Sequence, residues 1–128
     1  MHDYSARATL ATKFHLALVS RNWESLRDLI ADDAVWILPG NNAISDTAVG
    51  VDAVVARARK IAEYGLNFAL KNILLSRTDV ALGLHNTAER SGVQLDEHLT
   101  TVLRIRDGQI HSIETFLSDV DRMNRFFR

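Results

Sequence analysis

The stretch VALGLHNTAERSGVQLDEHLTTVLRIR, residues 80–106, alternates apolar and polar side chains on both sides of the pair Ser91-Gly92. Such alternation is typical of β-strands that bury one face, and a Ser-Gly pair between two such runs favours a two-residue hairpin turn. Counting back from the turn places Asn86 opposite Glu97. Both lie on the inward face, so the sequence predicts a hairpin with polar groups inside.

The rest of the chain supplies helices before this hairpin and one more strand after it. Apolar residues recur at helical spacing over Ser5–Ser20 and over Trp23–Ile30, where Asp32-Asp33 is expected to stop the second helix. A third helix is expected after Gly50. The other predicted elements are the strand Ala34–Leu38, a polar loop over Asn41–Thr47, the strands Leu66–Ser76, Val80–Arg90, Val93–Arg106 and Gln109–Leu117, and a terminal helix from Ser118.

This order predicts one α+β domain over residues 1–128, with three N-terminal helices packed over the concave face of a curved sheet. The chain has 47% hydrophobic residues, enough for one continuous core. Its 15 basic and 16 acidic residues give no charge excess that would attract nucleic acid or a membrane surface. Cysteine is absent and no segment is apolar enough to cross a membrane, so we expect a cytoplasmic protein.

The last hairpin can form in two ways, because residues 106–109, RDGQ, suit either a two-residue turn or a three-residue turn with a glycine bulge. The two-residue turn would put Ser112 and Glu114 inside. The bulged turn, which we favour, would turn the other set inward: His111, Ile113, Thr115 and Leu117.

Several short motifs resemble, in this order, those of the SnoaL-like polyketide cyclases and ketosteroid isomerases. They are Asp32-Asp33-Ala34-Val35-Trp36, Pro39-Gly40, Gly50-Val51-Asp52-Ala53-Val54 and Arg104-Ile105-Arg106-Asp107-Gly108-Gln109-Ile110. The resemblance covers nearly the whole chain. It implies the cone-shaped fold of nuclear transport factor two, with a ligand held between sheet and helices and a homodimer formed through the outer sheet face. It says little about function, because the family contains several kinds of enzyme and non-catalytic proteins.

The catalytic positions of these relatives carry over incompletely. The resemblance matches the isomerase's tyrosine oxyanion donor to His15, its general-base aspartate to Leu38, and its protonated acid to Thr101. The cyclase acid on the last strand corresponds to Thr115. Leucine cannot accept a proton, so the resemblance implies this fold with its usual chemistry removed or rearranged.

His15 and Glu97 are the two candidate catalytic residues. His15 lies on the apolar stripe of the first predicted helix, and histidine suits proton transfer near neutral pH. A core histidine bonded to a backbone carbonyl is the alternative. Glu97 is the only carboxylate that the alternation places inside, with Asn86 opposite to orient it. A hydrated carboxylate at the rim of the sheet is the alternative for Glu97.

The other predicted site residues are polar side chains that could polarise a substrate oxygen, and apolar walls. The polar ones are Asn86, Thr101, Thr115 and, under the bulged turn, His111; the walls are Trp36, Leu38 and Phe68. The leading hypothesis is an enzyme that isomerises, cyclises or dehydrates an apolar polyketide-, terpenoid- or steroid-like substrate by proton transfer, without a cofactor. The alternatives are a non-catalytic carrier or sensor of small apolar molecules, and a dimeric interaction module.

The hairpin register also places His85 opposite His98 on the outer face. Two imidazoles without a carboxylate make an incomplete metal site, so we expect the rings to pack together without a metal ion. Small residues such as Gly83 surround them, which would let a second sheet approach. We therefore expect a homodimer through this face.

Overall fold

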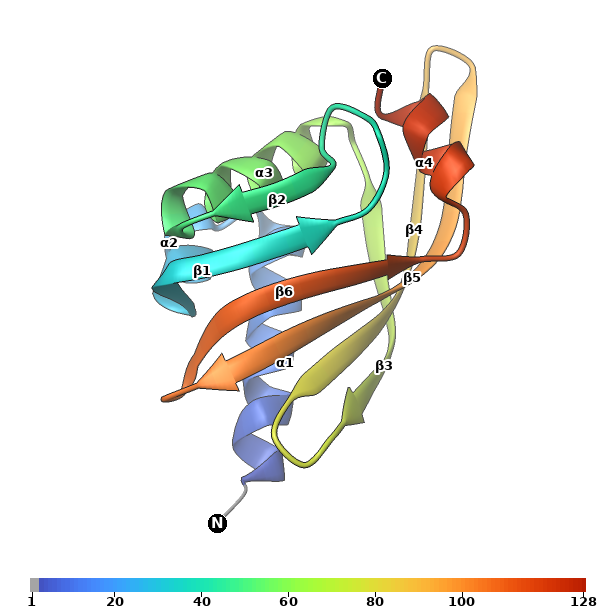
Figure 1. The fold of residues 1–128 in the computed structure, drawn as a ribbon. Helices are drawn as coiled ribbons and strands as arrows, with labels where there is room; N and C mark the ends of the chain where they lie inside the picture. The colour runs from blue at the N-terminus through green and yellow to red at the C-terminus, as the bar shows by residue number, and fades with distance from the viewer. Residues whose placement is uncertain (1–2) are drawn as a thin grey trace.

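A six-stranded sheet and four helices form the described part of the chain, residues 3–128, in this computed structural model (Figure 1). The strands are β1 (Ile30–Leu38), β2 (Asp46–Val49), β3 (Asn67–Leu75), β4 (Val80–Arg90), β5 (Val93–Arg106) and β6 (Gln109–Leu117), and the helices are α1 (Tyr4–Ser20), α2 (Trp23–Asp28), α3 (Val51–Glu63) and α4 (Val120–Phe126). None of the described helices has the length and apolar character needed to cross a membrane.

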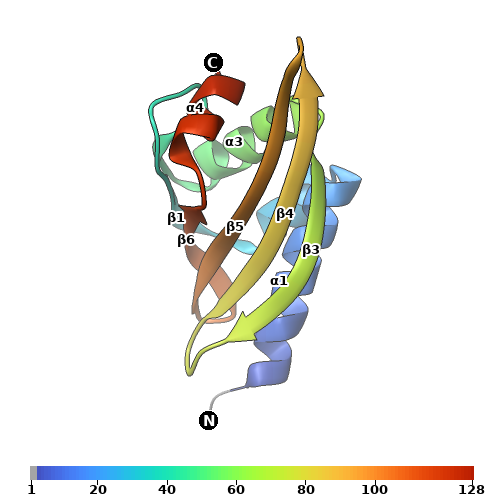
Figure 2. The same cartoon turned by 90° about the vertical axis from the view of Figure 1, so that its right-hand side faces the viewer.

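The sheet has the strand order β2-β1-β6-β5-β4-β3, and it is mixed because β1 runs parallel to β6 while the other pairs are antiparallel. The long strands β3, β4 and β5 bend together along their length (Figure 2). Helix α1 packs on β3 and β4, and α3 packs on β1 and β2. The predicted α+β fold, with helices over one face of a curved sheet, is thus confirmed.

The central hairpin has the predicted register. Arg90 pairs with Val93, and Asn86 pairs with Glu97 across β4 and β5. Ser91 and Gly92 both take a positive φ, 52° and 79°, as the tight turn between right-twisted strands requires. The inward face is buried as the alternation indicates, with Leu82, Leu84, Leu95 and Leu103 in the core.

The last hairpin differs from the predicted bulged turn. Asp107 and Gly108 form a two-residue turn, since Arg106 pairs with Gln109, and the extra residue comes later in β6. There Ile105 pairs with Ile110 while Arg104 pairs with Ser112, which leaves His111 as the bulge. Moving the bulge into the strand buries both flanking isoleucines, Ile110 and Ile113, in the core, which a bulge at the turn would not do.

The consequence for the rest of β6 matches the predicted orientation. Thr115 faces inward and is 4% exposed, whereas Glu114 faces outward and receives a hydrogen bond from Arg104 at 3.2 Å. The location of the bulge was therefore predicted wrongly, while the sides taken by Ile113 and Thr115 were predicted correctly.

The region after α2 is also corrected. The second helix ends at Asp28, and β1 begins at Ile30. Asp32 and Asp33 lie inside this strand, where its register with β6 shifts, so they do not stop a helix. Asp33 accepts hydrogen bonds from Arg106, at 2.9 Å to Oδ1, and these bonds hold the pKa of the Asp33 carboxyl below its usual value.

Strand β2 was missed, because the predicted loop extended through Thr47. This edge strand has only four residues and starts at a charged one, Asp46. Its pairing partner is β1, with Trp36 opposite Ala48. A strand this short has too few residues for its alternation to be recognised, and its existence depends on the neighbour that completes its hydrogen bonds.

The turn before α3 depends on Gly50. Its backbone has φ 91° and ψ 155°, a region that only glycine occupies readily, and its N–H donates to Ala34 O at 2.7 Å.

We expect Gly50→Ala to lower the free energy of unfolding by about 2–3 kcal/mol in urea denaturation. Gly92→Ala is the matched control, because Gly92 is also at positive φ but takes the more accessible left-handed turn conformation, and its loss should be about 1 kcal/mol. Equal losses would contradict this account.

Candidate ligand-binding site

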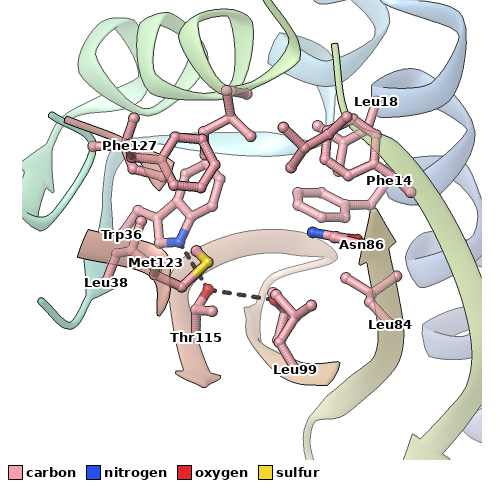
Figure 3. Close-up of a pocket in the computed structure, with 16 residues that line it drawn as sticks. Phe14, Leu18, Trp36, Leu38, Leu84, Asn86, Leu99, Thr115, Met123 and Phe127 are labelled. Atoms are coloured by element: carbon pink, nitrogen blue, oxygen red, sulfur yellow. Dashed lines mark hydrogen bonds between the residues drawn. The ribbon is translucent and has the colours of Figure 1, made fainter. Parts of the chain in front are cut away.

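A narrow cavity lies between the sheet and helices α1, α3 and α4 (Figure 3). The cavity is small, with a volume of about 40 Å³. Apolar side chains form most of the wall: Phe14, Leu18, Trp36, Leu38, Ile44, Ala58, Ile61, Leu66, Phe68, Leu84, Leu99, Met123 and Phe127. A large ligand therefore requires the walls to move apart.

Three further residues complete the lining, and they are the polar ones: Asn86, Thr101 and Thr115. No acidic, basic, histidine, tyrosine or cysteine side chain is among the described residues that line the cavity. The site can therefore offer apolar contact and hydrogen bonds, but no lining side chain of this kind can exchange a proton near neutral pH.

The two threonines form a hydrogen-bonded chain with Trp36. The indole Nε1–H donates to Thr115 Oγ1 at 3.1 Å, and Thr115 Oγ1 lies 3.3 Å from Thr101 Oγ1 (Figure 3). An indole can only donate, so Thr115 is an acceptor in the first bond. The two hydroxyl groups carry two hydrogens and the bond between them uses one. The other hydrogen can be donated to a ligand oxygen.

Asn86 is the second polar contact. Its amide projects from β4 toward the middle of the cavity (Figure 3), and the residue is 6% exposed. Its Oδ1 is buried and has no hydrogen-bond partner within the described chain. Burying an unpaired acceptor costs free energy, so this amide oxygen favours a ligand that supplies a hydrogen-bond donor such as a hydroxyl group.

Glu97 lies beside the cavity but does not line it. The residue is fully buried, and its Oε2 accepts hydrogen bonds from Ser118 N at 2.6 Å, Ser118 Oγ at 2.7 Å and Asp119 N at 3.1 Å. These donors belong to the segment that enters α4. Glu97 thus anchors that segment to β5, and its full burial differs from the hydrated rim position considered as its alternative. Its Oε1 has no partner within the described chain.

The two predicted histidines also stay outside the lining. His15 Nε2–H donates to the Phe68 carbonyl oxygen at 2.8 Å, which is the backbone-bonded arrangement considered as the alternative. His111 is the bulge residue of β6, and its Nδ1–H donates to the Arg104 carbonyl oxygen at 3.2 Å. Of the predicted site residues, the structure gathers six around the cavity: Trp36, Leu38, Phe68, Asn86, Thr101 and Thr115.

The part of the wall that comes from the end of the chain and from the loop before β2 was not predicted from the sequence. Met123 and Phe127 close one end, and Ile44 lies beside them. Asn124 Oδ1 joins the two segments, because it accepts hydrogen bonds from Asn41 N and Asn42 Nδ2, each at 2.8 Å. The only sequence signal for this wall was the run of aromatic side chains at the end of the chain.

Arg57 of α3 contacts both the backbone and the ring of Trp36. It donates to Trp36 O at 2.9 Å and to Ser45 O at 3.0 Å, and its guanidinium lies 5.5 Å from the centre of the indole ring. Partial burial lowers the pKa of Arg57 from its usual value, against a smaller opposing effect of Asp46. These contacts place the indole so that its N–H points to Thr115.

Comparison with known proteins identifies the family. A model of the SnoaL-like domain matches residues 11–113, which is most of the chain. The chain belongs to the SnoaL-like family. No curated protein matches this SnoaL-like chain significantly in sequence.

Solved structures agree with that assignment. Bal32a, from a soil-derived mobile gene cassette, is 26% identical with a TM-score of 0.90, over 96% of this SnoaL-like chain and 97% of Bal32a. An NTF2-like protein from Burkholderia xenovorans is 16% identical with a TM-score of 0.86, over all of both chains. TerC, co-crystallised with polyporic acid, is 13% identical with a TM-score of 0.83, over 96% of this chain and 98% of TerC. The two more distant proteins show the fold alone.

The anchoring role of Glu97 can be measured. Glu97→Gln keeps the size of the side chain but removes the charge that three donors share. Because hydrogen bonds to charged groups contribute about 1.5–3 kcal/mol, we expect a loss of that size in the free energy of unfolding, measured by urea denaturation. Glu89→Gln, at an exposed position of β4, should change stability by less than about 0.5 kcal/mol. A Glu97→Gln variant as stable as wild type would show that the anchor is unimportant.

Proposed function

We propose that this SnoaL-like protein binds a small, largely apolar molecule that carries at least one carbonyl or comparable acceptor oxygen, and does not transform it by proton transfer. The single observation that carries this proposal is the lining: apolar walls with one asparagine and two threonines, and no ionisable side chain among the described residues around the cavity. Small-molecule sites commonly combine a mostly apolar wall with a few placed polar groups.

The polar groups specify the ligand chemistry. The hydroxyl hydrogen left over in the Thr101–Thr115 pair is a donor, and the Asn86 amide presents a second polar group on the neighbouring strand β4. Two groups placed on different strands can orient a ligand that has an oxygen near each. Polyketide-, terpenoid- and steroid-like molecules have this chemistry, and TerC shows that a protein of this fold was crystallised with polyporic acid.

Access to the cavity requires movement of the end formed by α4. The open core of about 40 Å³ holds only a few water-sized groups, far less than a polycyclic ligand needs. Helix α4 is short, seven residues, and its contacts with the loop before β2 are the hydrogen bonds of Asn124 and the bond from Ala43 N to Phe127 O. Separation of these two segments would widen the chamber beside Met123 and Phe127. A homodimer through the outer sheet face remains a prediction alongside this proposal.

A matched pair of small ligands tests the polar contact. The ketone 1-tetralone and the hydrocarbon tetralin differ by one carbonyl, and their dissociation constants can be measured by ligand-observed NMR. We expect Thr101→Val to weaken 1-tetralone binding by about three- to tenfold, the range of one neutral hydrogen bond, and to leave tetralin binding unchanged. Thr100→Val is the matched control, because Thr100 pairs with Gly83 on the opposite face of the same strand. Equal weakening of both ligands would contradict a specific oxygen contact.

An acid/base enzyme is the second candidate, and one observation favours it. Glu97 Oε1 is buried without a partner in the described chain, on the inward face directly opposite Asn86, which lines the cavity. Glu97 lies beside the wall, so its carboxyl group could act on a ligand only if lining side chains moved aside. It corresponds to the leading hypothesis from the sequence, which is isomerisation, cyclisation or dehydration by proton transfer.

Deuterium exchange separates the two candidates. With 1-tetralone in D₂O, a proton-transferring site should accelerate exchange of the hydrogens next to the carbonyl, as followed by NMR. We expect no acceleration beyond that of buffer alone, even at protein concentrations that bind the ketone. Acceleration by the wild type that is lost in a folded Glu97→Gln variant would favour the enzyme and overturn the binding-only proposal.

A further inference from the structure

The outer face of the sheet carries a cluster that the proposed function does not use. His85 of β4 and His98 of β5 are cross-strand partners, and their rings are stacked, with centroids 4.1 Å apart and planes 8° from parallel. Asp96, two residues before His98, shares that face. His85 Nε2–H donates to Asp96 Oδ1 at 2.5 Å. The ring packing agrees with the prediction, whereas the contribution of Asp96 to this cluster was not predicted from the sequence.

We propose that His85, Asp96 and His98 form a binding site for a divalent transition-metal ion of the Zn²⁺ type. One ligand atom from each residue lies within 4.8 Å of the other two. Imidazole nitrogens and a carboxylate oxygen are ligands that Zn²⁺ takes at about 2.0–2.2 Å, which places ligand atoms of a tetrahedral site about 3.4 Å apart. Metal binding would require the stacked imidazole rings and the Asp96 side chain to rotate until their ligand atoms reach that spacing.

The hydrogen bond from His85 to Asp96 indicates where the ion would lie. The shared hydrogen sits between an imidazole nitrogen and a carboxylate oxygen, the two kinds of atom that a metal ion would join in its place. The site needs loss of the bridging hydrogen and no change in the backbone.

The backbone around the cluster is well suited to hold three ligands in place. Strands β4 and β5 pair without interruption from Val80 to Arg90, so His85, Asp96 and His98 project from one continuous ladder. In the single chain, Asp96 and His98 are exposed and His85 is half-buried, so an ion can reach all three from solvent. Three protein ligands leave a fourth position for water or a further ligand.

Two basic side chains lie near the cluster and affect which metal ions it would bind. Arg122 donates to the Asp96 backbone oxygen, and Lys71 shares a shallow groove with His98. These positive charges disfavour weakly held cations, whereas a transition metal gains strong bonds to the two imidazoles. Hard ions such as Mg²⁺ and Ca²⁺ prefer all-oxygen sites, so the two histidines select against them.

Isothermal titration calorimetry of the metal-free protein with Zn²⁺ tests the site. We expect equimolar binding, with no heat from Mg²⁺ under the same conditions. Loss of even an outer hydrogen-bond partner of a metal ligand lowers affinity by about 10–100-fold, so His85→Asn, Asp96→Asn and His98→Asn should each weaken Zn²⁺ binding by about tenfold or more. The melting temperature should rise with Zn²⁺ in the wild type and much less in these variants.

Asp33→Asn is the matched control. Asp33 is also a strand carboxylate paired with a basic side chain, and its side chain is 71% exposed against 68% for Asp96. Its Zn²⁺ affinity should equal that of the wild type. Circular dichroism of each variant without metal checks that it is folded. The proposal is overturned if Zn²⁺ does not bind, or if folded variants of the three ligands bind it as tightly as the wild type.

Discussion

The register of β6 between two partners is the constraint on which the site depends. This strand pairs parallel with β1 on one side and antiparallel with β5 on the other. Because side chains alternate along a strand, a shift of one residue would exchange Thr115 for Glu114 inside the cavity. The bulge at His111 prevents that exchange, since it buries both Ile110 and Ile113 and leaves Thr115 beside Thr101. The chemical character of the cavity therefore depends on one extra residue in a strand.

The second determinant is the closure of the cavity by the end of the chain. A buried carboxyl group such as that of Glu97 suggests catalysis. Its Oε2, however, accepts hydrogen bonds from three donors at the start of α4. That arrangement holds Met123 and Phe127 against the pocket. A carboxylate can thus be inward, buried and close to a ligand site while its contacts serve the architecture.

The SnoaL-like fold and the residues that line this cavity determine different properties of the site. The fold places a chamber between sheet and helices, and the residues around the chamber decide its chemistry. Leu38 and Thr101 lie at the positions where the resemblance implies acids in the isomerases. Near them, the Trp36 indole N–H donates a hydrogen bond to Thr115 Oγ1. The opposite face of the same strands carries ionisable groups instead, in His85, Asp96 and His98. The period of two along β4 and β5 separates an apolar binding face from a face with metal-ligating groups.

The sequence by itself determined the class of fold, the β4–β5 register and most of the polar lining. These follow from local patterns: alternation over eleven and more residues, a Ser-Gly turn, and helical spacing before them. Tertiary structure alone decided where β6 bulges, that β1 begins at Ile30, that residues 46–49 form a strand, and that α4 closes the cavity. Each depends on a partner distant in sequence, because a bulge, a short edge strand and a helix cover are stable only when the opposing surface is present. Strand alternation places Asp96 on the same face as His98, but its hydrogen bond to His85 depends on side-chain direction across the strand pair.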